Sequence, residues 1–340
     1  MTLPNGISIV ICTYNGINRL GPTLLSIFSQ QLTSDISWEL IIVDNASTDN
    51  TTDFCRKMIE SSAFGNKSRI VFESKQGCNH ARLKGLQEVK YRWLLFCDDD
   101  NHLFPDYLEQ AWSILNNNEN IGVLGGIGIP LFEDQKPDWF DTYSKSFAVG
   151  PQSKTDGKIT ISDKKQLYSA GSFFRKGVLI KYYDNGFTTI MKGPSGKELT
   201  RGEDTEWCFM IQLAGFDLWY SSSLKFYHYM SKERMTWAYY LKLKTGIAKG
   251  ESKLLCYHLF LKFQKKSGFY FFILYFKNLL YYNFFWLQFK IRSSIAPSRY
   301  SIEELSLGKS IIKAKASTFN KDFTKAYSQF NCLKRILQSK

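Results

Sequence analysis

The sequence predicts an α/β protein with a mostly parallel central sheet flanked by helices and a C-terminal helical region. Short apolar runs alternate with helical patterns four times before residue 126, joined by short links. Hydrophobic residues make up 44% of the 340 residues and charged residues 22%, as in a folded globular chain. From residue 233 onward helical patterns dominate. We therefore expect one domain over residues 1–230 and a helical region over residues 231–340.

Each expected strand is a short apolar run, and each expected helix has apolar residues three or four positions apart. The strands are expected at 7–12, 39–43, 69–72, 93–97 and 121–126. The helices between them are expected at 19–31, 52–61, 79–89 and 105–115. The ligands of such sheets bind beyond the carboxyl ends of the strands.

Beyond residue 130 the pattern becomes less regular. Residues 169–176 indicate a turn of small residues that leads into an apolar helix. Residues 185–202 are rich in glycine, and a helix with an acidic first turn is expected at 203–213. Two short strands are expected at 216–219 and 224–229.

The charge is unevenly distributed along the chain. Residues 225–340 contain 22 Lys and Arg against 5 Asp and Glu, a balance of +17, whereas residues 1–224 contain 22 against 26, a balance of −4. This asymmetry indicates an anionic partner for the C-terminal region. Nucleic acid is not expected, because no recognised binding motif accompanies the charge.

A run of aromatic residues lies within the basic region. Residues 269–289 contain twelve aromatics in 21 positions, interrupted by Lys277 and three polar residues. A basic helix rich in Trp and Tyr favours a membrane surface, so we expect peripheral membrane contact through residues 231–295. Burial against the first domain or in an oligomer, and a membrane span, are the alternatives.

The cysteines indicate a reducing compartment. Their number is seven and no pair has CxxC spacing, which argues against a disulfide framework or a zinc ribbon. Residues 1–6 do not have the pattern of a secretory leader. We expect a cytoplasmic protein, with a peripheral position on the inner face of the cell membrane as one option.

The strongest chemical feature is the carboxylate triplet, Asp98, Asp99 and Asp100, directly after the apolar strand WLLFC. Three adjacent carboxylates repel one another, so a cation or hydrogen-bond donors must compensate them. Carboxylates suit Mg²⁺ or Mn²⁺, and Mg²⁺ completes its shell with water and substrate phosphates. The triplet therefore predicts a metal–diphosphate site. A solvated acidic turn before the next helix is the alternative.

Two further segments lie at strand ends. Thr13 and Tyr14 follow the first strand, and Asp44 follows the second. Asp44 would accept a hydrogen bond from a base or ribose, or form an Asx turn with Asn45 and Ser47.

Three more side chains are candidates for binding or catalysis. Arg82, near the start of the third helix, would meet an anionic ligand or be solvated. Asp204, in the first turn of the helix at 203–213, would act as a general base or stabilise the helix dipole. His228 lies on an aromatic strand, where a histidine is more often structural than a ligand.

Several well-known motifs are missing from the sequence. It lacks the P-loop pattern, a GxGxxG after the first strand, the GxSxG elbow and HExxH. The missing motifs disfavour P-loop hydrolysis, dinucleotide-dependent redox chemistry, and hydrolases that use a GxSxG elbow or an HExxH zinc site.

Six segments in a fixed order resemble glycosyltransferase family 2. They are SIVICTYNG (8–16), ELIIVDNASTDNT (39–51), GCNHARLKG (77–85), LLFCDDDNHLFPDYLE (94–109), SAGSFFRKGV (169–178) and GEDTEWCFMIQLAGF (202–216). The resemblance covers about two thirds of the chain and implies the glycosyltransferase-A fold.

The resemblance also implies a role for each matching residue. Thr13 and Tyr14 would flank the nucleotide base, which Asp44 would hydrogen-bond, and Arg82 would lie near the base or phosphate. Asp98 or Asp99 would face the ribose, and Asp100 would ligate Mn²⁺ or Mg²⁺, with His228 near the metal. Asp204 corresponds to the catalytic base.

The implied activity is inverting transfer of a single sugar from a nucleotide-sugar, with UDP the usual nucleotide of the family. The QxxRW motif of processive members is absent, which disfavours polymer synthesis. The expected acceptor is a glycan or a lipid-linked glycan in surface polysaccharide synthesis. A nucleotidyltransferase and a non-catalytic binding module on the same fold are the alternatives.

Overall fold

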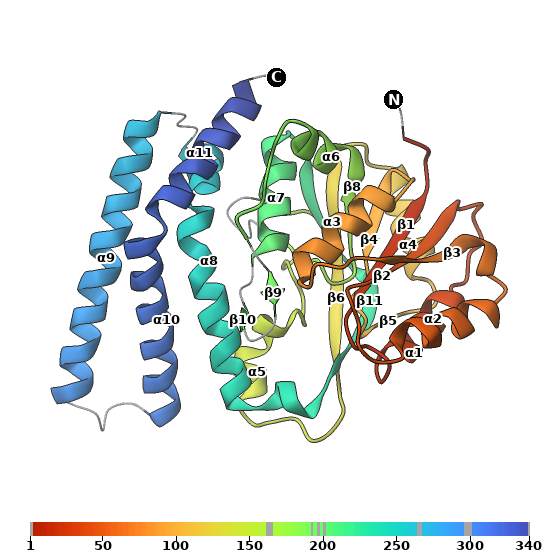
Figure 1. Ribbon diagram of the computed structural model, residues 1–340, viewed down its shortest axis with the longest axis horizontal. Coiled ribbons are helices and arrows are strands. Elements are labelled where there is room, and N and C mark those ends of the chain that lie inside the picture. The colour runs from red at the N-terminus through yellow and green to blue at the C-terminus, as the bar shows by residue number, and fades with distance from the viewer. Residues whose placement is uncertain are drawn as a thin grey trace. The chain divides into compact units, whose positions relative to one another are not determined.

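The computed structural model describes residues 3–160, 166–191, 193–195, 198–199, 202–263, 267–295 and 301–338. The chain forms two compact units (Figure 1). The first comprises residues 1–181 and 207–235, and the second comprises residues 182–206 and 236–340. The boundary at residue 206 falls inside helix α7 (Glu203–Leu213).

The first unit is built on a sheet with the strand order β3-β2-β1-β4-β8-β6-β11-β5, and β7 pairs with β11. Its strands are β1 (Ile7–Thr13), β2 (Trp38–Asp44), β3 (Ser68–Phe72), β4 (Trp93–Phe96), β5 (Asn101–Leu103), β6 (Ile121–Phe132), β7 (Gly157–Lys158), β8 (Ser172–Arg175) and β11 (Asp217–Met230). Strands β3, β2, β1 and β4 are parallel, as are β6 and β11, whereas β8 and β5 pair antiparallel with their neighbours. The predicted fold class is confirmed, and the sheet as a whole is mixed.

Several strands differ from the sequence prediction. Residues 172–175, expected in a turn, form β8 between β4 and β6. The two strands expected between 216 and 229 form one strand, β11, with an irregularity between Tyr220 and Lys225. The three-residue strand β5 was not predicted, because so short a run has no periodicity.

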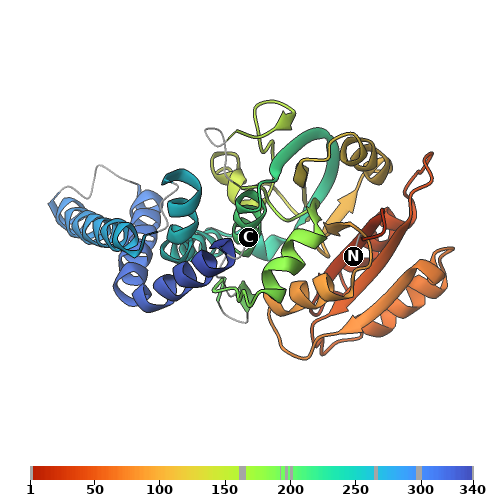
Figure 2. The ribbon, with the colours of Figure 1, turned by 90° about the horizontal axis from the view of Figure 1, so that it is seen from above.

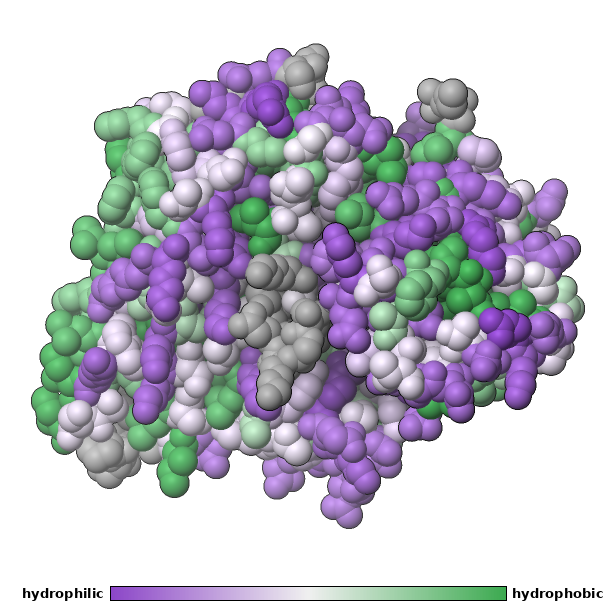
Figure 3. All heavy atoms as spheres, in the orientation of Figure 1, coloured by the Kyte–Doolittle hydropathy of each residue, from purple (hydrophilic) through white to green (hydrophobic). Residues whose placement is uncertain are grey.

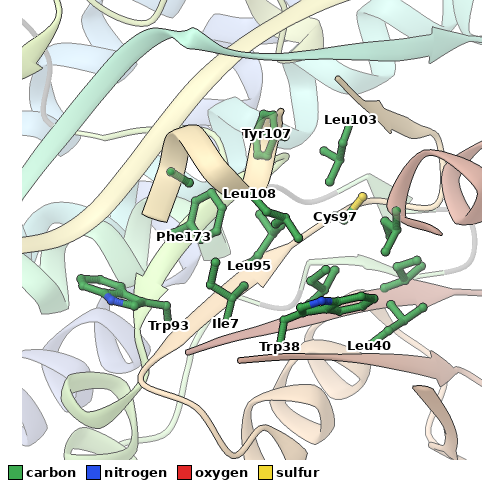
Figure 4. Close-up of a cluster of buried hydrophobic side chains, with 14 of the residues drawn as sticks. Ile7, Trp38, Leu40, Trp93, Leu95, Cys97, Leu103, Tyr107, Leu108 and Phe173 are labelled. Carbon is green, nitrogen blue, oxygen red and sulfur yellow. The ribbon is translucent and has the colours of Figure 1, made fainter. Parts of the chain in front are cut away.

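Helices cover both faces of this sheet. Helices α1 (Leu20–Phe28), α2 (Thr51–Glu60) and α4 (Tyr107–Asn116) share one hydrophobic core with the odd-numbered residues of β1 and β4. Figure 4 shows this core, in which Ile7, Leu95 and Leu108 point toward one another. The alternation of side chains along each strand sends the even-numbered residues to the other face.

Helix α3 (Cys78–Glu88) covers the other face. Gly85 allows its close approach, because a Cβ at this position would lie 2.5 Å from Cγ1 of Val10 on β1. On the same face, Phe96 packs against Phe174 of β8 and Trp207 of α7, with ring centroids 5.9 and 5.2 Å away. The described residues also form α5 (Phe140–Tyr143), α6 (Lys176–Asp184) and the 3₁₀ turns η1 (Gly65–Lys67), η2 (Ser144–Phe147) and η3 (Lys232–Met235).

The second unit is mainly helical. Its elements are the hairpin of β9 (Pro194–Ser195) and β10 (Glu198–Leu199), and the helices α8 (Trp237–Phe263), α9 (Gly268–Ile295), α10 (Ile302–Lys321) and α11 (Phe323–Gln338). In Figures 1 and 2, α9 lies at one edge of this group, beside α10. Within the described part of the chain, no helix is both long and apolar enough to cross a bilayer.

Aromatic rings join the helices of the second unit. Phe271 and Tyr275 are the buried residues of α9. The ring of Phe271 lies 5.0 Å from that of Phe330 on α11, and the ring of Tyr275 lies 5.2 Å from that of Phe319 on α10. The hydroxyl of Tyr275 donates to the carbonyl of Phe319 at 2.7 Å. One face of α9 is thereby fixed against its neighbours.

Candidate functional site

The carboxyl ends of three parallel strands meet at one edge of the sheet. Thr13 at the end of β1 is in register with Asp44 at the end of β2, and β4 on the other side of β1 leads into Asp98. The backbone N–H of Asn45 donates to the carbonyl of Thr13 at 2.9 Å. The predicted collection of polar segments at one edge of the sheet is therefore present.

Asp99 is tied to the segment that follows β1. The hydroxyl of Thr13 donates to Asp99 Oδ2 at 2.7 Å. Arg19 makes a bidentate contact, from Nε to Oδ1 at 2.8 Å and from Nη2 to Oδ2 at 2.7 Å. Arg19 also donates to the carbonyls of Tyr14 and Asn15, both at 3.0 Å. One guanidinium thus holds the turn after β1 against the turn after β4.

Asp98 faces helix α3. Its Oδ1 lies 3.3 Å from Nη2 of Arg82, whose side chain is only 7% exposed. The guanidinium of Arg82 also lies over the ring of Phe96, 5.3 Å from its centroid. Arg82 is therefore a buried cation at the edge of the site, and not a solvated one.

Asp100 contacts two side chains from the last part of the first unit's sequence, His228 and Arg234. Arg234 Nη1 lies 2.6 Å from Asp100 Oδ2, and His228 Nε2 lies 3.3 Å from Oδ1. The antiparallel pairing of β5 with β11 places His228 opposite Asn101. The backbone N–H of Tyr229 donates to the carbonyl of Asp100 at 2.9 Å. Strand pairing therefore brings this histidine beside the carboxylate triplet.

Each carboxylate of the triplet contacts a different arginine. The pairs are Asp98–Arg82, Asp99–Arg19 and Asp100–Arg234. Burial by itself would raise the pKa of Asp100, but His228 and Arg234 outweigh burial and lower that pKa below its ordinary value. Burial opposes the charge of Arg19, yet the contact with Asp99 raises the arginine's pKa above its usual range. Three arginine side chains thus compensate the charges of the triplet.

Asp44 is buried and held by its own neighbours. The N–H of Ser47 donates to Asp44 Oδ1 at 2.9 Å, and the hydroxyl of Thr52 donates to Oδ2. The first of these bonds involves Ser47, one of the two partners named with the Asx-turn alternative, but it reaches three residues on rather than the two of an Asx turn. Of the pair expected near the base, Thr13 is buried and Tyr14 is 43% exposed.

Two residues of the site form a pair that suits a divalent cation. Asp100 and His228 converge at 3.3 Å and are both buried. In the described ranges, no group of three or more His, Cys, Asp or Glu residues could hold a metal ion. Mg²⁺ commonly binds through one or two protein ligands and takes the rest from phosphates and water. A carboxylate with an imidazole fits such an ion and favours Mn²⁺ over Mg²⁺, because Mg²⁺ prefers oxygen ligands.

Asp204 belongs to the second unit, in the first turn of α7, and is half-buried. Its Oδ1 accepts the N–H of Thr205 at 2.7 Å. Gly202 immediately before the helix has φ +130, and a Cβ there would lie 2.3 Å from Cε of Met191. Three acidic residues in this turn, Glu203, Asp204 and Glu206, also suit the positive end of the helix dipole.

Glu206, two residues further on, lies in a buried hydrogen-bond network. Its Oε1 accepts the hydroxyl of Tyr257 on α8 at 2.8 Å and Nε2 of Gln329 on α11 at 3.3 Å. Its Oε2 accepts the hydroxyl of Thr189. Gln329 also donates to the Tyr257 hydroxyl at 3.2 Å. This carboxyl joins the start of α7 to two helices of the second unit.

We predict that Glu206 makes the stability of the protein depend on pH. Burial raises the pKa of Glu206 to about 7. Because this exceeds the unfolded value of about 4.3, the folded state binds the proton more tightly. Stability should therefore be greatest below about pH 4.3 as far as this group is concerned, and fall by about 3 kcal/mol as the pH rises to about 7.

Thermal unfolding of the wild type and of Glu206→Gln between pH 5 and pH 8 would measure this effect. The amide keeps the shape and cannot ionise, so the stability of Glu206→Gln relative to wild type should increase across this interval. Glu60→Gln, which alters an exposed carboxylate at the end of α2, is the matched control and should track the wild type. A constant difference between Glu206→Gln and wild type would contradict the prediction.

Not all of the site could be found from the sequence. The structure brings together Thr13, Arg82, the carboxylate triplet and His228 in the first unit, whereas Asp204 belongs to the second. Arg19 and Arg234 were not predicted. A basic residue six positions after Thr13 was visible, but nothing in the sequence indicated its partner.

The chain is similar to several known proteins. Residues 8–181 match the family model "Glycosyl transferase family 2". An uncharacterized glycosyltransferase from Haemophilus influenzae is 32% identical over 118 residues, which cover 35% of this chain and 37% of that protein. TuaG of Bacillus subtilis, named for teichuronic acid biosynthesis, is 30% identical over 105 residues, which cover 31% of this chain and 39% of that protein. The chain spans about a third to a half of the length of the curated relatives it matches.

Solved structures share the fold. The crystal structure of S. aureus TarS 1–349 in complex with UDP has a TM-score of 0.52 at 16% identity and covers 98% of this chain and 90% of that chain. The complex of the same protein with UDP-GlcNAc has a TM-score of 0.51 at 15% identity and covers 94% of this chain and 92% of that one. At this identity the likeness concerns the fold.

Proposed function

Because the chain belongs to glycosyltransferase family 2, we propose that it transfers a single sugar from a nucleotide-sugar to an acceptor hydroxyl with inversion at the anomeric carbon. The observation that carries the proposal is the carboxylate triplet at the carboxyl ends of parallel strands, where His228 and three arginines surround it. In this proposal residues 1–230, together with Arg234, bind the donor and catalyse transfer. Residues 231–340 contact an acceptor, a membrane or a second copy.

The donor we propose is linked to UDP. TarS, which shares the fold, was crystallised with UDP and with UDP-GlcNAc. Thr13 and Tyr14 would flank the base at the end of β1. Asp44 would meet the base through the lone pairs that its bonds to Ser47 and Thr52 leave unused. Asp98 or Asp99 would accept hydrogen bonds from the ribose hydroxyls.

The arginines of the site suit the diphosphate. A guanidinium binds carboxylate and phosphate oxygens with the same forked geometry. The guanidinium groups of Arg82 and Arg234 lie 3.3 and 2.6 Å from carboxylates of the triplet, where they would meet the diphosphate oxygens. Arg19, which is bidentate on Asp99, would keep that carboxylate in place. Positive charge would then face the group that gains charge during transfer.

Asp100 and His228 would hold a divalent cation, Mn²⁺ before Mg²⁺. When bound, such an ion neutralises negative charge on the diphosphate leaving group. Asp100 is ionised under physiological conditions because its pKa is lowered by His228 and Arg234 against the effect of burial. It can therefore act as a ligand without first losing a proton. His228 would ligate the ion as a neutral imidazole, so the ion and Arg234 would then be the cations beside Asp100.

Asp204 would act as the general base. Its carboxylate takes the proton from the acceptor hydroxyl while that oxygen forms a bond to the anomeric carbon. The bond between the anomeric carbon and the diphosphate oxygen breaks, and its electron pair leaves with the nucleoside diphosphate. Attack from the side opposite the leaving group inverts the configuration. The proton ends on Asp204 and returns to solvent.

The acceptor we propose is a glycan or a lipid-linked glycan of a surface polysaccharide. The relationship to TuaG, named for teichuronic acid biosynthesis, supports this class. The absence of QxxRW from the sequence supports transfer of one sugar rather than processive synthesis. We further propose that the protein works at the inner face of the cell membrane, in peripheral contact through residues 231–295.

Calorimetric titration of the purified protein with UDP, GDP, CDP and ADP, with and without Mn²⁺, tests the donor site. We expect one nucleotide, UDP, to bind at least tenfold more tightly when Mn²⁺ is present. Titration with UDP-sugars would then identify the sugar. A folded protein that binds none of these nucleotides would contradict the proposal and favour a non-catalytic module.

A further inference from the structure

Helix α9 exposes a continuous row of large apolar side chains, here called the α9 stripe. Its members are between 49% and 78% exposed. They are Phe269, Ile273, Phe276, Leu280, Phe284, Leu287, Ile291 and Ile295. They lie on the side opposite the buried Phe271 and Tyr275, about half a turn away at 100° per residue. The helix therefore has two apolar sides, and its own neighbours cover only one of them.

The α9 stripe has a strict repeat of eleven residues. The offsets 0, 4 and 7 from Phe269 recur from Leu280, and the offsets 0 and 4 recur from Ile291. Eleven residues make slightly more than three turns of an α-helix, so the row stays on one side over a length of about 39 Å. A heptad repeat would instead drift around a straight helix. A row of this kind can contact a flat apolar surface along the whole length of the helix.

The charges around the α9 stripe have one sign. Residues 268–295 contain two Lys, one Arg and no Asp or Glu. By helical geometry, Lys277 and Lys290 lie on opposite sides of the stripe, each within a quarter turn of its centre. Residues 236–340 contain 19 Lys and Arg against 4 Asp and Glu, a balance of +15. Figure 3 shows apolar side chains along α9.

We propose that the α9 stripe is a docking surface for a bilayer that contains anionic lipid. Apolar side chains would enter the boundary between headgroups and acyl chains, while Lys277 and Lys290 reach back to the phosphates. Tyr270 and Tyr281, which are 42% and 50% exposed beside the stripe, suit the interface. The described helices include none that could cross the bilayer, so the helix lies on its surface.

Charge decides between a bilayer and a second copy as the occupant. A dimer through the α9 stripe would bring two regions of +15 together with no acidic residue on either α9 to offset them. Anionic headgroups have the opposite sign and attract such a region by about 1 kcal/mol for each Lys or Arg near the surface. This inference rests on the proposed function only for its purpose, which is to bring the donor site to a lipid-linked acceptor.

Co-sedimentation with vesicles tests the proposal directly. The full chain would be mixed with vesicles of phosphatidylcholine alone and of phosphatidylcholine with 30% phosphatidylglycerol, at low and at physiological salt. We expect binding to the anionic vesicles at least about tenfold stronger than to the neutral ones, and weaker binding as salt rises. A full chain that stays in the supernatant with both vesicle types would overturn the proposal.

Two variants separate the apolar and the electrostatic contributions. Ile273→Gln/Leu280→Gln/Leu287→Gln should reduce vesicle binding at least tenfold. Its matched control is Leu25→Gln/Phe72→Gln/Leu131→Gln, which removes three apolar side chains that are 39% to 62% exposed in the first unit and should bind like wild type. Lys277→Gln/Lys290→Gln alters exposed cations only, and should remove the preference for anionic lipid even if the stripe variant fails to fold.

Two further measurements keep the outcomes distinct. Light scattering after gel filtration would show whether the stripe mediates a dimer. A dimer that the stripe variant abolishes, without vesicle binding by either protein, would overturn the proposal in favour of a second copy. UDP titration of the stripe variant should match that of the wild type, because the α9 stripe contains no residue of the proposed donor site. This measurement distinguishes a failed donor site from a failed membrane surface.

Discussion

Replacing Asp204 by Asn should lower kcat by about three orders of magnitude while leaving the affinity for the nucleotide-sugar within about twofold of wild type. General base catalysis contributes about 10² to 10⁴ to a rate, and an amide cannot accept the proton. Asn is nearly isosteric with Asp, and the loss of one charge near the dipole of α7 should destabilise the helix by no more than about 1 kcal/mol. Activity, and not folding, should therefore respond.

Single-turnover transfer and calorimetric titration would measure the two effects of Asp204→Asn separately. Asp53→Asn is the matched control, because Asp53 is an exposed carboxylate that also lies in the first turn of a helix, α2. Asp53→Asn should transfer sugar like the wild type. Turnover by Asp204→Asn at the wild-type rate would refute the assignment of the base.

Replacing Asp100 by Asn should abolish the effect of Mn²⁺ on nucleotide binding. Among the contacts of the described residues, Asp100 is the carboxylate of the triplet that meets a histidine, with 3.3 Å between the His228 nitrogen and the carboxylate oxygen. In the presence of Mn²⁺ the affinity for UDP should fall by about 100-fold, which is about 2.7 kcal/mol. Without Mn²⁺ the affinity should change little, because the cations of Arg19, Arg82 and Arg234 remain.

The neighbouring carboxylate provides a comparison for Asp100→Asn. Asp98 contacts Arg82 and no histidine, so Asp98→Asn should weaken UDP binding to the same extent with and without Mn²⁺. Asp134→Asn, an exposed acid in the loop after β6, should change neither. If Asp100→Asn keeps the full response to Mn²⁺, Asp100 is not the metal ligand.

Local periodicity was enough to predict the first half of the fold. The runs that became β1 to β4 are apolar over four to seven residues, and the helices between them have apolar residues every three or four positions. Strands β5 and β8 lack such a signal. β5 is three residues long, and β8 follows a segment of small residues and pairs antiparallel on both sides. Each depends on partners distant in the chain.

The same distinction applies to the site. That Asp98, Asp99 and Asp100 would lie beside Thr13 followed from the rule that parallel strands end at one edge of the sheet. That Arg234 would contact Asp100, 134 residues earlier in the chain, followed from no rule. It required the antiparallel pairing of β5 with β11, which carries His228 and Arg234 to the triplet.

Helix α9 shows most clearly what each level determined. The sequence by itself determined that this segment is helical, aromatic and basic, because helical periodicity and charge are local properties. Its strong apolar character on several sides left open which side would be buried. Only the tertiary structure decided that Phe271 and Tyr275 pack against α10 and α11 while the α9 stripe stays exposed. The reason is that burial depends on which distant elements a helix meets, and composition alone does not encode that contact.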